Sequence, residues 1–452
     1  MEFNPEKIFK NYNNHNLDKV SAIDQLSSLI ENSDNISIRI ESIEILERIG
    51  VGDDNVFNLF ENLLISDSND KVRIAAAKGL KNIFIDKALE PMKWALIHEE
   101  SPSCLTVVYN TLINILKSLA IDDNRLTKLF FYNEVKKIRR KEFMIDFQIQ
   151  CETKCFDDYP LQELVNIIVN YFTLLFLEKV YWRLKSNIER CTIIELDFIF
   201  KGLTTLPDAI ANLLNLKKLI LRYNQLFKLP KWIGSLKDLE ILNINVNNLN
   251  KLPRSIGNLN CLKYLSLWKN ELNELPSSIG FLKSLEYLNL RINNLKSLPE
   301  TISNLKKLKE LNLHDNKLEF LPNTIGSLQQ LERLNLSWNN LVKIPESIGN
   351  IKSLQILDLE RNELVHLPKS IGNLKSLKIL NLSDNKIEYL PETIGSINSL
   401  QYLNISRNNL KKLPHSLLSL ISLEELYIGD NKFNVASKII EKLEKKGVQI
   451  FF

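Results

Sequence analysis

The stretch LKKLILRYNQLFKLPKWIGSLKD, residues 216–238, decides the fold of this chain, because its pattern returns every 23 residues. An asparagine keeps this spacing at Asn224, Asn247, Asn270, Asn293, Asn316, Asn339, Asn362, Asn385, Asn408 and Asn431. A proline keeps it at Pro207, Pro230, Pro253, Pro276, Pro299, Pro322, Pro345, Pro368, Pro391 and Pro414. Two registers with one period indicate a row of equivalent structural units.

Within one unit, the apolar side chains change from strand spacing to a different pattern. Leu219 and Leu221 alternate as in a strand and put both side chains on one face. Pro230 and Ile233 with its following glycine break that pattern and favour a tight or short helical return. The apolar positions of the unit are Leu216, Leu219, Leu221, Leu226, Leu229, Ile233 and Leu236. Each is worth about 1.5–3 kcal/mol when buried, but only neighbouring units can bury them. We therefore predict a stack of eleven units.

The repeating asparagine is interpreted as a structural residue. It follows the strand pattern, and its amide offers two donors and an acceptor to backbone groups of its own turn and the adjacent one. The ends of the array differ from its middle. Lys201 replaces the asparagine in the first unit, and residues 436–446 predict an amphipathic helix that Gly447 ends. Val448 and Ile450 then predict a short strand that closes the open edge of the sheet.

The unit L-x-x-L-x-L-x-x-N-x-L-x-x-L-P-x-x-I-G-x-L resembles the 23-residue intracellular class of leucine-rich repeats. It is most similar to the Ras-suppressor or SHOC-2-like group and to the plant intracellular Ras-group-related proteins. The resemblance implies an α/β solenoid with a parallel sheet on its concave face. It also implies a non-catalytic scaffold that binds a protein partner in signalling, such as a small GTPase, a kinase or a phosphatase.

Outward side chains between the buried leucines are the candidate partner-binding residues, because they line the concave face of such a solenoid. They lie one, two, four and six residues before each repeating asparagine. Trp, Tyr and Arg are enriched in binding hot spots, and we expect Trp268 and Trp338 to be exposed. The candidates are Arg222, Tyr223, Tyr264, Trp268, Lys269, Tyr287, Arg291, His314, Trp338, Glu360, Arg361, Tyr402 and Arg407. His314 and Asp315 are expected to be strand neighbours that point to different sides, which makes them a poor catalytic pair.

The N-terminal part of the chain predicts a second kind of repeat. Segments that start at Ile36, Asp70 and Ser103 align at spacings of 33–34 residues and have apolar positions at helical spacing. The middle segment resembles the second helix of a HEAT-like repeat. We therefore predict an all-α HEAT-like domain over residues 1–121, a helical connector and N-terminal cap over 122–190, eleven leucine-rich repeats over 191–433, and a C-terminal cap helix and strand over 434–452.

Residues 122–190 leave two alternative functions open. The basic run KKIRRK, Lys136–Lys141, could contact nucleic acid or an acidic membrane, although such a run is more often a solvated helix face. Cys151 and Cys155 could belong to a cryptic, ligase-type catalytic segment. The apolar stretch Leu161–Ser186 predicts one long helix that is too charged for a membrane span.

Composition is that of an ordinary soluble protein. The chain has 452 residues, 25% of them charged, and a net charge of +4, which gives no reason to expect a nucleic-acid partner. Its five cysteines are odd in number and irregularly spaced, which indicates free thiols in a reducing compartment and no zinc site. The N-terminus has no signal-peptide core, so we expect a cytoplasmic protein. Catalytic and cofactor-binding motifs are missing from the sequence, and we expect no enzyme activity, cofactor, metal or small-molecule substrate.

Overall fold

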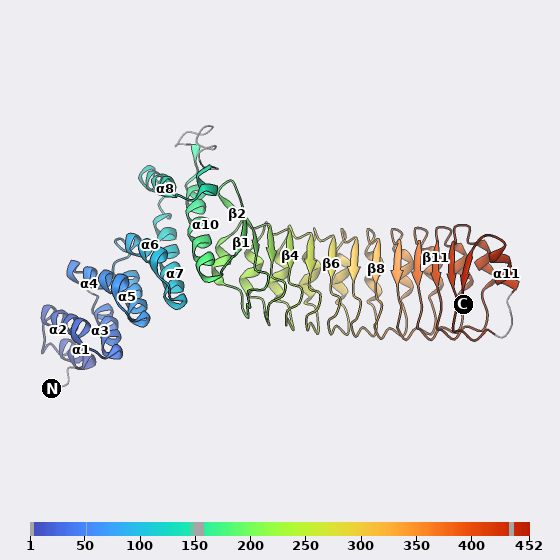
Figure 1. Cartoon of the computed structure of the whole chain (residues 1–452), viewed down its shortest axis with the longest axis horizontal. Helices are drawn as coiled ribbons and strands as arrows, with labels where there is room; N and C mark the ends of the chain where they lie inside the picture. Colours follow the sequence, from blue (N-terminus) through green and yellow to red (C-terminus); the bar gives the residue numbers. More distant parts are fainter. Residues whose placement is uncertain (1–3, 51, 146, 148–157, 434–437) are drawn as a thin grey trace. The chain divides into compact units, whose positions relative to one another are not determined.

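The computed structural model describes residues 4–50, 52–145, 147, 158–433 and 438–452. These residues form a run of helices that is followed by a long parallel sheet with short helical turns (Figure 1). By its contacts the chain divides into two compact units, residues 1–184 with 188–193 and residues 185–187 with 194–452. Cys151 and Cys155, on which the ligase-type alternative depends, lie outside the described residues.

The first unit consists of packed helices whose starts carry polar caps. The helices are α1 (Pro5–Asn13), α2 (Lys19–Asn32), α3 (Ile36–Ile49), α4 (Asp54–Ser66), α5 (Asp70–Ile83), α6 (Leu89–His98), α7 (Pro102–Leu119), α8 (Arg125–Lys137) and α10 (Leu161–Val180). Helix α2 packs on α3, α4 on α5, and α6 on α7. Asp18, Asn35 and Asn69 accept hydrogen bonds from backbone amides in the first turns of α2, α3 and α5, and such a cap is worth about 1 kcal/mol. The three predicted helical segments are therefore confirmed as α3, α5 and α7.

Helix α10 is shorter than the sequence predicts. It ends at Val180 and does not continue to Ser186. The chain turns after it because Arg183 has a left-handed φ of +54°, which a right-handed helix cannot include, and strand β1 (Lys185–Glu189) follows. By length and composition alone α10 could cross a membrane. Yet 12 of its 20 residues are buried, Leu164 and Phe172 among them, as in the core helix of a folded domain.

The second unit is built on a parallel sheet whose strands follow one another in chain order. The strands after β1 are β2 (Thr192–Asp197), β3 (Lys218–Ile220), β4 (Ile241–Asn243), β5 (Tyr264–Ser266), β6 (Tyr287–Asn289), β7 (Glu310–Asn312), β8 (Arg333–Asn335), β9 (Ile356–Asp358), β10 (Ile379–Asn381), β11 (Tyr402–Asn404), β12 (Glu425–Tyr427) and β13 (Gln449–Phe451). Leu219 pairs with Leu242, and Leu242 with Leu265, so equivalent residues of neighbouring repeats lie side by side. Each of these three leucines is fully buried.

The return path of each repeat is a single turn of 3₁₀ helix that begins after the repeating proline. These turns are η2 (Asp208–Asn212), η3 (Lys231–Ser235), η4 (Arg254–Asn258), η5 (Ser277–Phe281), η6 (Glu300–Asn304), η7 (Asn323–Ser327), η8 (Glu346–Asn350), η9 (Lys369–Asn373), η10 (Glu392–Ser396) and η11 (His415–Ser419). Neighbouring turns approach so closely that a Cβ on Gly326 would lie 2.1 Å from the carbonyl oxygen of Ser347. A glycine at this place therefore allows the close packing of neighbouring turns, although Ala211, Ser303 and Leu418 occupy it in three repeats.

The C-terminal end of the sheet is covered by the chain itself. Helix α11 (Lys438–Glu444) is followed by Gly447, whose φ of +91° suits a glycine, and β13 then pairs in parallel with β12. The last strand thus satisfies the edge of β12. The predicted fold class, a solenoid with a parallel sheet that is preceded by an all-α region, is confirmed.

Candidate protein-binding face

The strands are only three residues long, and this divides the candidate residues into two groups. Positions six and four before each repeating asparagine lie on a strand, whereas positions two and one before it lie in the turn that follows. The residue directly before each repeating asparagine has a positive φ, for example +59° at Tyr223 and +56° at Trp338. We call the outward side chains of these four positions, on the strands and in the turns, the strand face.

His314 and Asp315 show the consequence of the short strands. Both residues lie beyond the end of β7, and Asp315 has a φ of +53°. The prediction that they are strand neighbours is therefore wrong. The reason is the change of backbone conformation from extended to left-handed at the second of the two residues.

The repeating asparagines hold these turns in place. In one repeat, Asn247 Oδ1 accepts a hydrogen bond from the Leu226 amide at 3.0 Å, and its Nδ2 donates to the carbonyl oxygens of Leu221 at 2.9 Å and Ile244 at 3.2 Å. Two of these three bonds reach the preceding repeat. The same pattern recurs through Asn431, and the asparagines before Asn431 are buried. Because buried backbone groups need partners, each asparagine fixes the turn on which strand-face residues stand.

Aromatic side chains on the strand face lie against one another. The rings of Tyr264 and Tyr287 stack with centroids 4.4 Å apart and an angle of 1° between their planes. Both rings are half-buried, and burial raises the pKa of Tyr287 to about 12. Trp338 is 43% exposed, as expected. Trp268 is half-buried and so is less exposed than the sequence predicts. The Nε1 of Trp268 is buried and has no hydrogen-bond partner among the described residues.

The middle repeats bring polar groups together in a way that the sequence did not reveal. His314 Nδ1 lies 2.7 Å from the Ser337 hydroxyl, and burial lowers the pKa of His314. Ser337 is only 2% exposed, and its hydroxyl donates to Asn335 Oδ1 at 2.6 Å. A serine held and covered in this way offers no accessible nucleophile, so the pair is a packing contact.

Carboxylates gather in the next repeats. Burial raises the pKa of Asp358. Burial also raises the pKa of Glu360, and the carboxylates of Asp358 and Asp384 raise it further. Arg361 lies between Glu360 and Asp384, at 3.8 and 4.0 Å from their oxygens, and Arg407 lies 3.5 Å from Asp384. This part of the strand face therefore has ion pairs and an excess of negative charge.

Sequence reasoning missed aromatic residues at both ends of the strand face. Phe200, which is 72% exposed, stacks on Tyr223 at 4.6 Å. At the other end, Tyr427 stacks on Phe451 at 4.3 Å and lies 5.2 Å from the ring of Tyr402. Phe200 and Phe451 belong to the atypical first repeat and to the C-terminal cap. The 23-residue period, extended back from Tyr223, reaches Phe200, but Phe451 lies 24 residues after Tyr427 and so falls outside that period.

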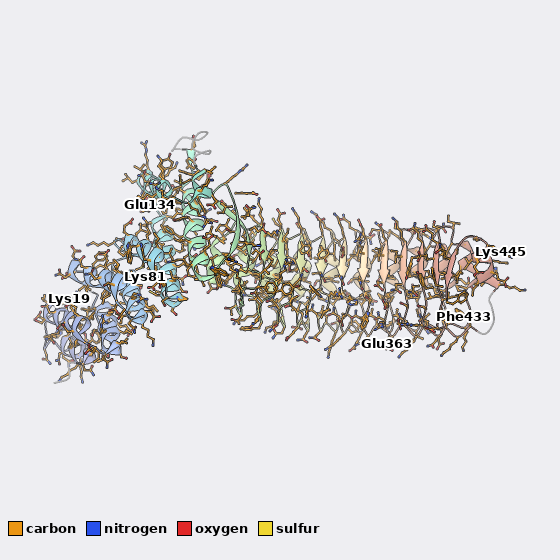
Figure 2. All side chains as sticks on the ribbon, viewed as in Figure 1. Lys19, Lys81, Glu134, Glu363, Phe433 and Lys445 are labelled. Atoms are coloured by element: carbon orange, nitrogen blue, oxygen red, sulfur yellow. The ribbon has the colours of Figure 1, made fainter. Side chains whose placement is uncertain are left out.

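The basic run of the first unit is partly used inside that unit. Lys137 Nζ donates to Glu134, which is labelled in Figure 2, and Arg140 donates to both oxygens of Glu178 at 2.6 and 3.0 Å. Lys136 lies 4.5 Å from the ring centre of Tyr132. Two cations of this run therefore already have carboxylate partners, which weakens the prediction of an anion-binding segment.

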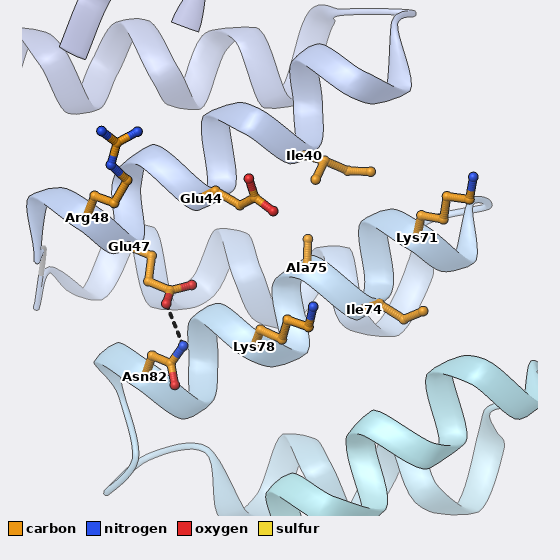
Figure 3. A pocket seen from close by; sticks show the side chains of 9 residues that line it. All are labelled: Ile40, Glu44, Glu47, Arg48, Lys71, Ile74, Ala75, Lys78 and Asn82. Atoms are coloured by element: carbon orange, nitrogen blue, oxygen red, sulfur yellow. Dashed lines mark hydrogen bonds between the residues drawn. The ribbon is translucent and has the colours of Figure 1, made fainter. Parts of the chain in front are cut away.

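A groove of about 480 Å³ lies between α3 and α5 in the first unit (Figure 3). Ile40, Ile74 and Ala75 contribute apolar surface to it. Its charged and polar lining residues are Glu44, Glu47, Arg48, Lys71, Lys78 and Asn82. Asn82 Nδ2 donates to Glu47 and links the two helices. This groove was not predicted from the sequence, because its lining comes from two helices whose packing the apolar periodicity does not define.

No group of three or more potential ligands that could hold a metal ion occurs in the part of the chain that the structure describes. Cys104 and Cys191 are buried, Cys261 is exposed, and none of these three cysteines forms a disulfide with a described residue. Burial raises the pKa of Cys104 to about 12, and the neighbouring Glu99 raises it as well. A thiol with such a pKa stays protonated at neutral pH and is a poor nucleophile.

The fold and this face define a class, the solenoids built from short strand-and-turn repeats with one outward-facing sheet. Residues 254–338 and 369–445 match the family described as leucine-rich repeat region, and residues 329–387 match the leucine rich repeat family. The chain is a leucine-rich-repeat protein with an N-terminal helical region. Repeats of this kind are generally non-catalytic and bind other proteins.

The chain is similar to several solved structures. A leucine-rich-repeat protein of Leptospira interrogans is 33% identical, with 56% of this chain and 82% of that chain covered and a TM-score of 0.33. A chain of the Drosophila Toll–Spatzle complex is 25% identical, with coverages of 56% and 37% and a TM-score of 0.52. The plant peptide hormone receptor RGFR1 in complex with RGF2 is 29% identical, with coverages of 50% and 42% and a TM-score of 0.44. This chain thus spans less than half of the last two. No curated protein matches it.

Proposed function

We propose that this chain is a non-catalytic scaffold that binds a protein partner through its strand face. The observation that carries the proposal is the exposed pair of Trp338 and Arg361, in which the guanidinium carbon lies 4.0 Å from the ring centre. Trp and Arg are enriched among residues that dominate binding energy. A tryptophan on a turn that buried asparagine bonds hold fixed loses little further entropy on binding. The Toll–Spatzle complex supports the proposal, because a similar solenoid occurs there in a protein complex.

The finer parts of the proposal rest on the resemblance of the repeat to the Ras-suppressor or SHOC-2-like and plant intracellular classes. They are a signalling role, a partner such as a small GTPase, a kinase or a phosphatase, and a cytoplasmic location. The HEAT-like character of the first unit belongs with them, and three helix pairs in succession, α2 with α3, α4 with α5 and α6 with α7, support it. A scaffold with two kinds of repeat has two surfaces on which partners can meet.

The test is affinity capture with the full chain from a lysate of its own source cells. Trp338→Ala with Arg361→Ala removes the exposed pair, and we expect the main captured protein to fall at least tenfold by quantitative mass spectrometry. The matched control is Phe320→Ala with Lys343→Ala, which removes an exposed aromatic ring and a cation outside the strand face. Equal capture by both variants, with unchanged circular dichroism, would show that the strand face is not the binding surface.

A further inference from the structure

Charge is distributed unevenly along the strand face. In the repeats of β3 to β6 its charged residues are all basic: Lys218, Arg222, Lys269 and Arg291. From β7 to β12 it has seven carboxylates and three arginines. The carboxylates are Glu310, Asp315, Asp358, Glu360, Asp384, Glu425 and Asp430. The strand face therefore has a basic half followed by an acidic half.

Ion pairing within the chain strengthens this contrast. Arg222, Lys269 and Arg291 are exposed and form no ion pair with a described residue, whereas Lys218 pairs with Glu195 at 2.7 Å. In the acidic half each arginine lies within 4.0 Å of a carboxylate, as Arg333 does at 3.9 Å from Glu310. The basic half thus has unpaired cations, while the cations of the acidic half are already paired and leave carboxylates in excess.

We propose that the strand face binds an extended polypeptide segment that has an acidic block and a basic block, with the acidic block over β3–β6 and the basic block over β9–β12. This inference rests on the proposed function and names the chemistry of its partner. Opposite charges that are matched in order fix the register of a bound chain and exclude other partners. A nucleic acid is disfavoured, because its uniform negative charge would be repelled by Asp358, Glu360 and their neighbours.

The spacing of the repeats sets the length of the segment. Parallel strands lie about 4.8 Å apart, so the span from β3 to β12 is on the order of 43 Å. An extended chain covers about 3.3–3.6 Å per residue, so roughly 13 residues reach from end to end. The distance from Arg291, in the repeat of β6, to Glu360, in the repeat of β9, corresponds to roughly four residues. His314 and Trp338 lie in the repeats between them and can contact the part of the bound segment that joins its two charged blocks.

The experiment compares two synthetic 13-residue peptides of the same composition by fluorescence anisotropy with the full chain at low salt. One peptide has four glutamates, five neutral residues and four lysines in blocks, and the other has the same residues with the charges alternating. We expect the block peptide to bind about tenfold more tightly. Its affinity should fall as salt is added, because exposed charge pairs are screened. Equal affinity of the two peptides would overturn the proposal.

Charge-reversed variants locate the contact. Arg222→Glu with Lys269→Glu and Arg291→Glu should weaken the block peptide at least tenfold. The matched control makes the same change of net charge on exposed residues outside the strand face, with Lys228→Glu, Lys251→Glu and Lys343→Glu. It should change the affinity for the block peptide less than twofold. Equal weakening by both variants would mean that only net charge matters and would overturn the proposal. Tighter binding of a single-stranded oligonucleotide than of the block peptide would also overturn the proposal.

Failure of this inference can be told apart from failure of the proposed function. If capture of the cellular partner is lost in Trp338→Ala with Arg361→Ala while the two peptides bind equally, the strand face is the binding surface but charge order does not select the partner. If capture survives every strand-face variant, the proposed function itself fails.

Discussion

The guanidinium of Arg361 lies over the indole ring of Trp338, and the two residues occupy the same position in consecutive repeats, directly before the repeating asparagine. Both have a left-handed backbone, with φ of +56° at Trp338 and +50° at Arg361. In each repeat, this left-handed conformation, which is uncommon for residues other than glycine, directs one side chain outward from the turn after the strand.

The asparagine hydrogen bonds should contribute measurably to the stability of the solenoid. Asn339 Oδ1 accepts from the Leu318 amide at 3.0 Å, and Nδ2 donates to the carbonyls of Leu313 and Leu336 at 2.9 and 3.0 Å. Asn339→Ala leaves these buried groups unsatisfied, so we expect a loss of about 3 kcal/mol or more in the free energy of unfolding. The control is the adjacent, exposed Asn340→Ala, which should cost less than about 0.5 kcal/mol. Urea denaturation of both variants measures the difference, and equal losses would contradict the role assigned to Asn339.

Left-handed positions that hold β-branched residues should be strained. Ile292 has a φ of +55°, which is unusual for a β-branched side chain, whereas asparagine tolerates this region. Ile292→Asn should therefore raise the free energy of unfolding by about 1 kcal/mol. Val342→Asn is the control, because Val342 is 55% exposed and has no positive φ. Thermal denaturation gives both values. A destabilised Ile292→Asn would show that contacts of the isoleucine outweigh its strain.

Close packing of the 3₁₀ turns should make the repeat glycine hard to replace. A Cβ at Gly326 would meet a backbone oxygen at 2.1 Å, so neighbouring turns must move apart to accept it. We expect Gly326→Ala to cost about 1–3 kcal/mol. Gly52→Ala is the control, because its Cβ would have no described atom within 4 Å. Ala211, Ser303 and Leu418 occupy the equivalent place in three other repeats, and Ser303→Gly should be neutral or stabilising. Tm values that do not separate the first two variants would contradict the packing argument.

Acid should weaken the first unit through Glu99. Burial alone would raise the pKa of this carboxyl, but hydrogen bonds from the Arg73 guanidinium, at 2.7 and 2.8 Å, and from the Ser101 amide hold its pKa at about 2. Since the pKa is lower in the folded state than its ordinary value of 4.5, the stabilisation is fully present above that value and is lost as the pH falls towards 2. Glu99→Gln should flatten this part of the pH profile.

Measurement of that pH profile needs a signal from the helices, such as ellipticity at a helical wavelength during urea denaturation. The control is Glu6→Gln, because Glu6 forms an ion pair with Arg48 in which both side chains are at least half exposed. Exposed pairs contribute little, so this variant should keep the pH dependence of the original chain. An unchanged slope in Glu99→Gln would show that other carboxyls cause the acid sensitivity.

Much of the second unit could be predicted because one period governs buried and turn residues together. Leu219, Asn224 and Pro230 each return every 23 residues, and burial of the leucines leaves only one register for the sheet. The same period identified which positions face outward. Tyr264 and Tyr287 were found in this way, since they differ by one repeat and therefore pair directly across β5 and β6.

The features of the structure that the sequence did not predict depend on backbone conformation or on contacts between side chains. The left-handed turn position carries Tyr223, Ile292 and Trp338 in different repeats, and these residues give no glycine or asparagine signature for a positive φ. Helix α10 ends early, at Val180, for a similar reason, because the turn that follows it includes the left-handed Arg183. His314 and Ser337 occupy equivalent positions of consecutive repeats, so the period places them side by side, but the 2.7 Å contact between His314 Nδ1 and the Ser337 hydroxyl depends on side-chain conformations that the period does not define.

Each asparagine holds the repeat before it, as Asn247 does by donating to the Leu221 carbonyl and accepting from the Leu226 amide. The asparagine hydrogen bonds are therefore alike at successive junctions, and a gain or loss of 23 residues within the array preserves them. The number of repeats can therefore change during evolution while the hydrophobic core keeps the same composition. The cost would fall on recognition, because one added unit shifts everything beyond it by about 4.8 Å along the partner.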